Sequence, residues 1–346
     1  MLATRQTAAL EELAFEAVHA ETLRFFPELV RSLGGDPASL VAEANLPSQC
    51  LSSGPAVGYR AIATLMELAA ERLRCSDFGL RLASLQGGSR VFGALGAVMR
   101  HAPTLGAGLR YVADHSHAHS QAARVRIHAD ACARRTLVSH EILVDRLPIK
   151  RQVIEQFMLL AHLNALELSG GRARVREVWF RFQPLAATRE YYDYFDCNVR
   201  FEQSLDGVVF SDSDLECETL EADSVRYAEA KAFIDSHYRG KVPMRAEVRA
   251  LITQLIDGGD CSKERVAAEL HMHPRTLHRR LTEEGTCFEE LKDAVRRDVA
   301  FGYLRGTNLS VQRIAEKVGY AEQSVLARSC SRWFDASPRA IRRNCP

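Results

Sequence analysis

Two segments in the last third of this 346-residue chain resemble each other at a fixed offset of 48 residues. The first reads RVAAELHMHPRTLHRRL from Arg265, and the second reads RIAEKVGYAEQSVLARS from Arg313. Each has a β-branched residue and an alanine that would face inward on a short helix, followed by a tight turn and a second helical pattern. The sequence therefore predicts two helix–turn–helix units, at about 262–282 and 310–332.

Residues around the two units support this prediction. Ser262 and Ser310 precede the first helices, where a serine hydroxyl can cap a backbone N–H of the first turn. Gly319 gives the second turn a permissive backbone. Between the units, FEELKDAVRRDVAFGYLRG has the amphipathic pattern of one connecting helix.

The second helix of each unit has an apolar face and a polar face. Leu277 and Leu281 predict the buried face in the first unit, and Leu326 does so in the second. The opposite face can enter the major groove of DNA, where Arg pairs with guanine and Gln with adenine, and Arg280 lies nearer the edge, where we expect a phosphate. The expected DNA-contacting residues are Arg275, Thr276, His278, Arg279, Arg280, Gln323, Ser324, Ala327 and Arg328.

Charge is distributed unevenly although the whole chain carries only +1. From Arg245 onward there are 18 lysines and arginines and 14 aspartates and glutamates, a net charge of +4, whereas the remainder carries −3. A mildly basic C-terminal third raises the possibility of a nucleic-acid partner. The nine cysteines are scattered without a C-x-x-C pair, so neither a disulfide framework nor a zinc ribbon is indicated.

Targeting and membrane segments are not indicated. The opening MLATRQTAALEELAFEAV carries Glu11, Glu12 and Glu16 within its apolar stretch, unlike a signal peptide. Apolar runs such as FGALGAVM are too short to cross a bilayer. We therefore expect a soluble cytoplasmic protein without a membrane partner.

The N-terminal part predicts an α+β domain. Helical spacing occurs in ETLRFFPELVRSL, DPASLVAEANL, YRAIATLMELAAERL and, after two alternating strand patterns, in IKRQVIEQFMLLAHLNALEL, which Gly170 ends. The strand patterns are ARVRIHADA, RTLVSHEIL, VREVWFRF and VRFEQSLDGVVF, and a turn around Asp206 and Gly207 joins the last two strands. The expected order is a mixed helix and sheet domain at 1–222, a helical connector at 223–241 with a boundary in RGKVPM, and an all-α domain at 242–346.

The C-terminal third resembles the DNA-binding domain of the AraC/XylS transcription regulators, above all in GYAEQS followed by RWFDASPRAIRR. GGDPASLVAEANLP, DFGLRLA and APTLGAGLRYV resemble the arabinose-binding-type sensor domain of one branch of that family. The resemblance implies an effector-controlled regulator, an activator more than a repressor, whose partners are promoter DNA, RNA polymerase and a second copy of the chain. His271 departs from a frequent family Gly, so its turn is expected to differ slightly, and Leu326 and Cys330 replace common aromatic residues.

Two further patterns suggest possible ligands, although no cofactor is expected. DHSHAHS sets His115, His117 and His119 at alternate positions, which would share one face of a strand and could bind a metal with Asp114 or His101. RARVR followed by EQSLDG is similar to the paired motif of PilZ-type cyclic di-GMP binders, with Glu202 where Asp or Asn is expected. The residues expected to bind this dinucleotide are Arg172, Arg176, Ser204 and Gly207.

The glycine-rich LQGGSRVFGALG lacks the G-x-G-x-x-G order, and the chain contains no G-x-S-x-G, H-E-x-x-H or P-loop motif. We therefore expect no enzyme activity. Two alternatives stay open: a regulator that senses a sugar, amino acid or metal, and an enzyme or metal-binding module with a helical tail.

Overall fold

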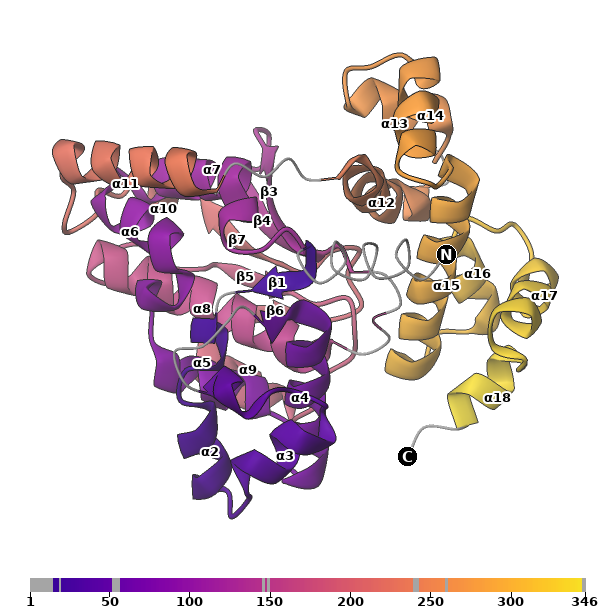
Figure 1. The fold of residues 1–346 in the computed structure, drawn as a ribbon, viewed down its shortest axis with the longest axis horizontal. Coiled ribbons are helices and arrows are strands. Elements are labelled where there is room, and N and C mark those ends of the chain that lie inside the picture. The colour runs from indigo at the N-terminus through magenta and orange to yellow at the C-terminus, as the bar shows by residue number, and fades with distance from the viewer. Residues whose placement is uncertain are drawn as a thin grey trace. The chain divides into compact units, whose positions relative to one another are not determined.

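The chain divides into two compact units in the computed structural model (Figure 1). The first comprises 1–144, 149–180 and 184–241, and the second consists mainly of 242–346. The residues that the structure describes are 15–18, 20–51, 57–144, 147, 150–238, 243–258 and 261–343. The expected boundary in RGKVPM falls largely on 239–242, which lie outside these ranges.

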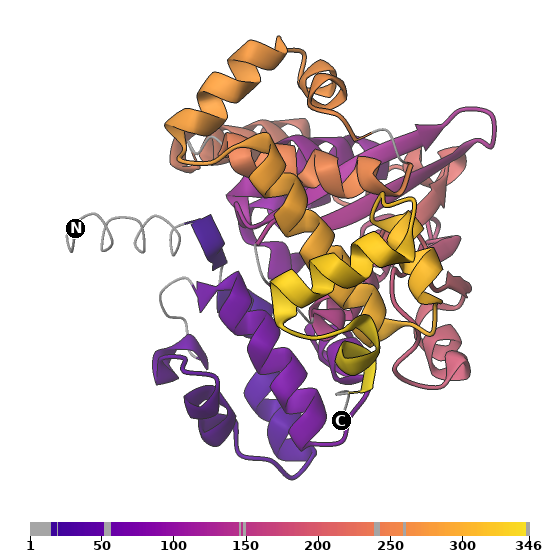
Figure 2. The ribbon, with the colours of Figure 1, turned by 90° about the vertical axis from the view of Figure 1, so that its right-hand side faces the viewer.

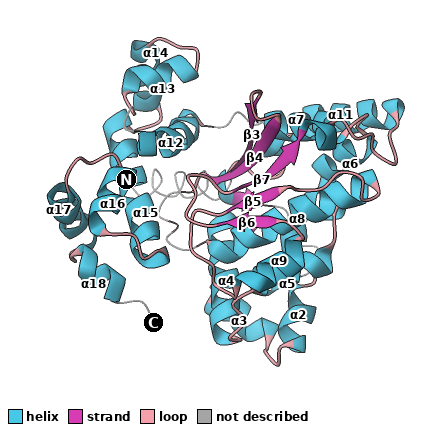
Figure 3. Cartoon of the chain, turned by 180° about the vertical axis from the view of Figure 1, so that it is seen from behind, coloured by secondary structure: helices cyan, strands magenta, loops and turns pink. Residues whose placement is uncertain are grey.

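The first unit combines helices with a sheet, which confirms the α+β fold class (Figure 3). The three helical patterns expected near its beginning are confirmed, the first as a short 3₁₀ turn (Ala20–Leu23) followed by α2. Its helices are α2 (Phe26–Ser32), α3 (Pro37–Glu43), α4 (Tyr59–Arg72), α5 (Phe78–Gln86), α6 (Gly93–His101), α7 (Leu105–His115), α8 (Arg151–Ser169), α9 (Thr188–Phe195), α10 (Asp212–Leu215) and α11 (Ser224–His237). Shorter 3₁₀ turns span Ser48–Leu51, Ser89–Phe92 and Ser116–Ala118.

The larger sheet has the strand order β3-β4-β7-β5-β6. Its strands are β3 (Ala123–Asp130), β4 (Arg135–Ile142), β5 (Glu177–Trp179), β6 (Asn198–Arg200) and β7 (Gly207–Ser211), and β1 (Ala17–Val18) pairs with β2 (Val57–Gly58) apart from it. β3 and β4 form the antiparallel pair that their alternating sequences indicate. The long helix that follows is also confirmed as α8, and Gly170 ends it in a left-handed conformation.

The predicted hairpin between β6 and β7 is wrong. β6 pairs in parallel with β5, and β7 pairs antiparallel with both β5 and β4, so β5 lies between the two expected partners. The physical reason is helix α9, which the sequence interpretation missed. It supplies the crossover that a parallel pair requires and buries Tyr191 and Phe195.

The expected connector forms α11, and this helix packs within the first unit. Its Ile234 is buried in an apolar cluster with Leu95 and Val98 of α6 and Tyr111 of α7. α11 and α6 lie side by side (Figure 1). Within the described ranges, no helix combines the length and the apolar character needed to cross a bilayer.

Among the described residues from 243 onward, the second unit contains helices joined by turns and loops and no strand, as its sequence pattern predicts. Its helices are α12 (Met244–Leu255), α13 (Lys263–Glu269), α14 (Pro274–Glu283), α15 (Phe288–Gly306), α16 (Val311–Lys317), α17 (Gln323–Phe334) and α18 (Pro338–Arg343). The connecting helix predicted between the two repeats is confirmed as α15.

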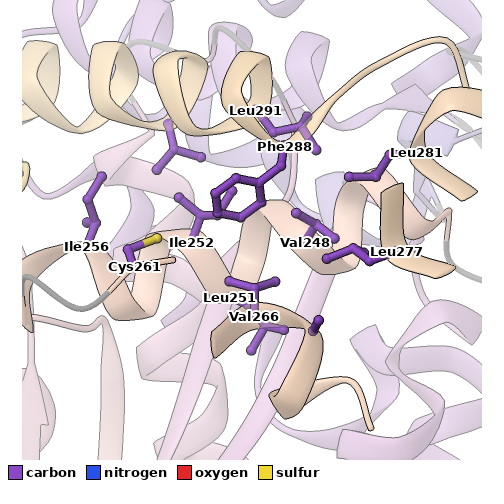
Figure 4. Packing of buried hydrophobic residues seen from close by; sticks show 12 residues of the cluster. Val248, Leu251, Ile252, Ile256, Cys261, Val266, Leu277, Leu281, Phe288 and Leu291 are labelled. Carbon is purple, nitrogen blue, oxygen red and sulfur yellow. The ribbon is translucent and has the colours of Figure 1, made fainter. Parts of the chain in front are cut away.

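Helix α15 contributes to two separate apolar cores. Its first half places Phe288 and Leu291 in a core shared with α12, α13 and α14 (Figure 4). Its second half places Tyr303 and Leu304 in a core shared with α16, α17 and α18. Val299 packs against both cores. The helix can be followed in Figure 2 from the orange helices toward the yellow ones, so each helix–turn–helix unit rests on one half of α15.

Candidate nucleic-acid interface

The first helix–turn–helix unit consists of α13 and α14. The Ser262 hydroxyl accepts a hydrogen bond from the Arg265 backbone N–H at 3.1 Å, which confirms the predicted cap of α13. α14 begins with Pro274, whose fixed φ suits a first helical position. The His273 ring nitrogen Nδ1 accepts from the Arg275 N–H at 3.2 Å and caps this second helix.

Helix α14 is oriented by its two leucines. Leu277 and Leu281 are fully buried against Val266 and the other residues of the first core, which confirms the predicted apolar face. The remaining candidate residues of this helix lie on its accessible side: Thr276 is half-buried, and the exposed ones are Arg275, His278, Arg279 and Arg280.

The arginines of α14 differ in their surroundings. Arg279 pairs with Glu283 one turn later at 2.8 Å, but both side chains are well exposed, so the pair is weak and holds Arg279 only loosely. Arg275 and Arg280 form no ion pair with any described residue. Helix α14 therefore presents guanidinium groups that a phosphate or a base edge can bind.

The second helix–turn–helix unit repeats this construction in α16 and α17. The Ser310 hydroxyl accepts from the Arg313 backbone N–H at 3.1 Å, the same distance as at the first cap, and confirms the second predicted cap. Leu326 and Cys330 are fully buried, so they determine which face of α17 is accessible. The candidate residues Gln323, Ser324 and Arg328 are exposed, and Ala327 is half-buried.

The same turn position is left-handed in both units. His271 has a φ of 53° and Gly319 a φ of 71°, and the two are 48 residues apart. His271 thus takes the conformation that glycine takes in the second copy, and the expected difference between the turns is not seen in this dihedral. A left-handed conformation strains a histidine but not a glycine.

The sequence interpretation missed two residues that hold the second helix–turn–helix unit in place. Gln312 accepts a hydrogen bond from the Gln323 N–H at 3.2 Å and caps α17, which Glu322 does not cap. Arg296 of α15 donates to the carbonyl oxygens of Val318 and Gly319 at 3.0 and 3.2 Å. Both lie on polar faces, where no local pattern distinguishes them from ordinary solvated residues.

The arginines of the expected dinucleotide site are engaged within the protein. Arg172 donates to the backbone oxygens of Ser169 and Glu218 at 2.9 and 2.8 Å. Arg176 donates to both carboxylate oxygens of Asp214 at 2.8 Å. Burial raises the pKa of Asp214, but hydrogen bonds from Arg176 and Ser211 outweigh it and hold the pKa below its usual range.

The other two residues of that expected site lie toward the far end of β5. The register pairs Trp179, the last residue of β5, with Gly207, whereas Arg176 precedes the strand. A Cβ on Gly207 would lie 2.8 Å from Leu137 and from the Val138 oxygen, so packing within the sheet requires this glycine. Ser204 is exposed in the preceding loop.

The three alternating histidines do not lie on a strand. His115 ends α7 and stacks on Tyr111, and His117 lies in a 3₁₀ turn with its ring 3.2 Å from the Tyr238 oxygen. His119 is buried after this turn. In the described part of the chain, no three His, Cys, Asp or Glu residues are grouped so that they could hold a metal ion.

Two capped helix–turn–helix units on one helix, each presenting arginine outward, define a DNA-binding protein. Residues 34–219 match the arabinose-binding domain of AraC transcription regulators, and residues 266–344 match a helix-turn-helix domain. The chain therefore belongs to the AraC family: it is a DNA-binding transcription regulator with an N-terminal ligand-binding domain.

A relative that matches nearly the whole chain supports this membership. The HTH-type transcriptional regulator VirS of Mycobacterium tuberculosis is 32% identical over 328 residues, which cover 94% of this chain and 96% of VirS. The ornithine utilization regulator of Pseudomonas aeruginosa is 34% identical over 79 residues, 23% of each chain. The crystal structure of the transcriptional regulator CdpR from Pseudomonas aeruginosa is 22% identical, with a TM-score of 0.41, and the alignment covers 90% of this chain and 97% of that one.

Proposed function

We propose that the protein is a cytoplasmic transcription activator that reads promoter DNA through α14 and α17 and responds to a small molecule bound by the first unit. The observation that carries the DNA-reading part is the paired set of outward arginines. Arg275 on α14 and Arg328 on α17 lie opposite the buried leucines of their helices, and Arg280 lies nearer the edge of α14. None of these three arginines forms an ion pair with a described residue. An arginine placed in this way can bond bidentately to guanine.

The proposal predicts base-specific effects at α14. Arg275→Ala should weaken binding by about 1–3 kcal/mol at one base pair of a preferred site, because a bidentate contact is lost. Duplexes selected by the full-length protein from a random pool, each then changed at single positions, supply the measurement.

Arg313→Ala is the matched control, because this exposed arginine lies on α16 and pairs with Glu316 at 2.8 Å. It should leave the base preference unchanged. Equal weakening of every duplex by Arg275→Ala would make Arg275 a phosphate contact and contradict its role in reading bases.

Activation through RNA polymerase is proposed from the family resemblance. Transcription in vitro from a promoter that carries a selected site measures it directly. A rise in transcript on adding the protein supports activation, and a fall identifies a repressor.

A homodimer is also proposed from the family resemblance. One subunit would read a single asymmetric DNA site, and a dimer would read two such sites. A protein that sediments as a monomer both free and on DNA would contradict it.

Cyclic di-GMP stays a proposed effector, supported by the spacing of Arg172, Arg176, Ser204 and Gly207 in the sequence. Arg176→Ala is a poor test because it also removes the partner of the buried Asp214. Arg172→Ala is cleaner, since Arg172 is exposed and contacts backbone oxygens. Calorimetry of the full-length protein should show binding that this substitution weakens. Absence of binding removes the candidate.

A further inference from the structure

A cavity of about 70 Å³ lies inside the first unit, between α6, α7 and α8 and the inner faces of β3, β4 and β7. Its wall is almost entirely apolar and includes Leu109, Phe157, Val208 and Phe210. One water molecule needs about 10–15 Å³, so the space is large enough for a ligand or several waters. An apolar pocket with a few polar groups is the usual form of a small-molecule site.

Two buried polar side chains on this wall have hydrogen-bonding atoms without a partner among the residues that the structure describes. His140 on β4 is 5% exposed; its Nε2 lies 3.1 Å from the Tyr59 hydroxyl, and its Nδ1 has no partner among the described residues. Asn164 on α8 is 2% exposed and donates to the Met99 sulfur at 3.4 Å. Its Oδ1 accepts no hydrogen bond from any described group.

Such unused atoms are unusual because leaving a buried polar group unpaired costs about 1–3 kcal/mol. Both side chains line one cavity, His140 from strand β4 and Asn164 from helix α8. A polar group on a bound ligand would supply the missing partners. An amide oxygen such as Asn164 Oδ1 requires a donor.

The charges on the cavity wall argue against further classes of ligand. Burial, together with the neighbouring His119 and Lys150, lowers the pKa of His140 to about 3, so its ring is neutral at ordinary pH. Among the described lining residues none is an aspartate or glutamate, and Arg124 is the one with a permanent charge. A cationic ligand would find no counter-charge on this wall, and a sugar would leave most of its hydroxyls unpaired against apolar side chains.

We propose that this cavity is an effector site, separate from the residues proposed for cyclic di-GMP, and that it takes a small, mainly apolar molecule whose head group is not cationic and can donate a hydrogen bond, such as a hydroxyl. This inference rests on the proposed function, because it names the class of molecule to which the regulator responds. Asn164 and His140 are its specificity-determining residues.

Calorimetry of the full-length protein tests this with four probes: hexanol, its isomer pentyl methyl ether, hexylamine and arabinose. Hexanol and the ether have the same heavy-atom count, but only hexanol can donate to Asn164 Oδ1. We expect hexanol to bind about tenfold more tightly than the ether, and hexylamine and arabinose to give no binding. Asn164→Leu should abolish the preference for hexanol over the ether.

His162→Leu is the matched control. His162 lies on the same helix, is similarly buried and also has a ring nitrogen that no described group contacts by a hydrogen bond, but it does not line the cavity. It should keep the hexanol preference. No hexanol binding, equal binding of hexanol and the ether, preferential arabinose binding, or equal loss in both variants would overturn the proposal. DNA binding is measured on the same samples as an independent test. A protein that binds DNA but not hexanol contradicts only the proposed effector cavity. A protein that does not bind DNA contradicts the proposed regulator function.

Discussion

At the residue scale, His271 and Gly319 occupy the same turn position of the two repeats and share a left-handed conformation. This conformation costs a residue with a side chain about 1–2 kcal/mol, whereas glycine adopts it freely. His271→Gly should therefore raise the free energy of unfolding by about 0.5–1 kcal/mol, after the greater chain entropy of glycine is subtracted. Denaturant unfolding of the full-length protein measures the change.

Gly319→Ala is the reciprocal substitution. Its Cβ would lie 3.3 Å from the Ile256 oxygen in addition to the unfavourable φ, so a loss of about 1–2 kcal/mol is expected. A stabilising Gly319→Ala, or a destabilising His271→Gly, would show that the left-handed turn does not control stability here.

Glu155, also at this scale, should make stability fall as pH rises. This fully buried carboxyl accepts a hydrogen bond from Tyr191 at 2.5 Å. Burial raises its pKa to about 8 against the smaller lowering by Tyr191, and Glu67 adds to the rise. The folded protein therefore keeps a proton that the unfolded chain loses above about pH 4.5, so the stabilisation is full below that pH and is lost as pH approaches about 8.

Glu155→Gln should remain neutral at every pH and lack this loss. Relative to the wild type, its free energy of unfolding should rise by about 1.4 kcal/mol for each pH unit between about pH 4.5 and pH 8. Denaturant titrations at several pH values between about 5 and 8 compare the two proteins. Parallel stability profiles would show that Glu155 is already ionised in the folded state.

At the scale of elements, α15 joins the two helix–turn–helix cores in one continuous helix. Leu326→Ala should remove about 2–5 kcal/mol from the second core, because a buried leucine is replaced by a cavity. Since α15 passes into the first core, amide hydrogen exchange should quicken in α13 and α14 as well as in α16 and α17. Leu277→Ala is the mirror-image control. Faster exchange limited to the mutated half would mean that the two units unfold separately.

Elements built from local patterns were the ones that could be predicted. The alternation in β3 and β4 and the helical spacing in α8 are complete within each segment, and the adjacent strands pair. The position of β6 was not predictable in this way, because its partner β5 lies across helix α9. Nothing in the local sequence of β6 distinguishes a parallel neighbour from the antiparallel hairpin that we expected.

In the candidate DNA-binding interface, too, the residues set by local spacing could be predicted and those set by tertiary contacts could not. Leu277 and Leu281 are four residues apart, so their spacing alone indicates which arginines of α14 are accessible. Gln312 and Arg296 stabilise α17 and its turn through contacts with other helices. Such contacts follow from tertiary packing, and polar side chains on a helix surface give no sign of them.

At the scale of the whole molecule, the two units divide the work of an AraC-family regulator. In our proposal the first unit encloses an effector cavity, and the second carries two DNA-reading helices on α15. An effector can change transcription only if it binds one arrangement of the protein more tightly than another. The DNA-reading half of this proposal can be tested without any effector.

The direct measurement is the fluorescence anisotropy of a selected labelled duplex with the full-length protein over a range of salt concentrations. The logarithm of the binding constant should fall linearly with the logarithm of the salt concentration, because bound arginines release counterions from phosphates. Arg280→Gln should reduce the slope by about one, because Arg280 lies nearer the edge of α14 and is expected to contact a phosphate. Absence of binding, or an affinity that does not change with salt, would contradict the assignment of α14 and α17 as DNA-reading helices.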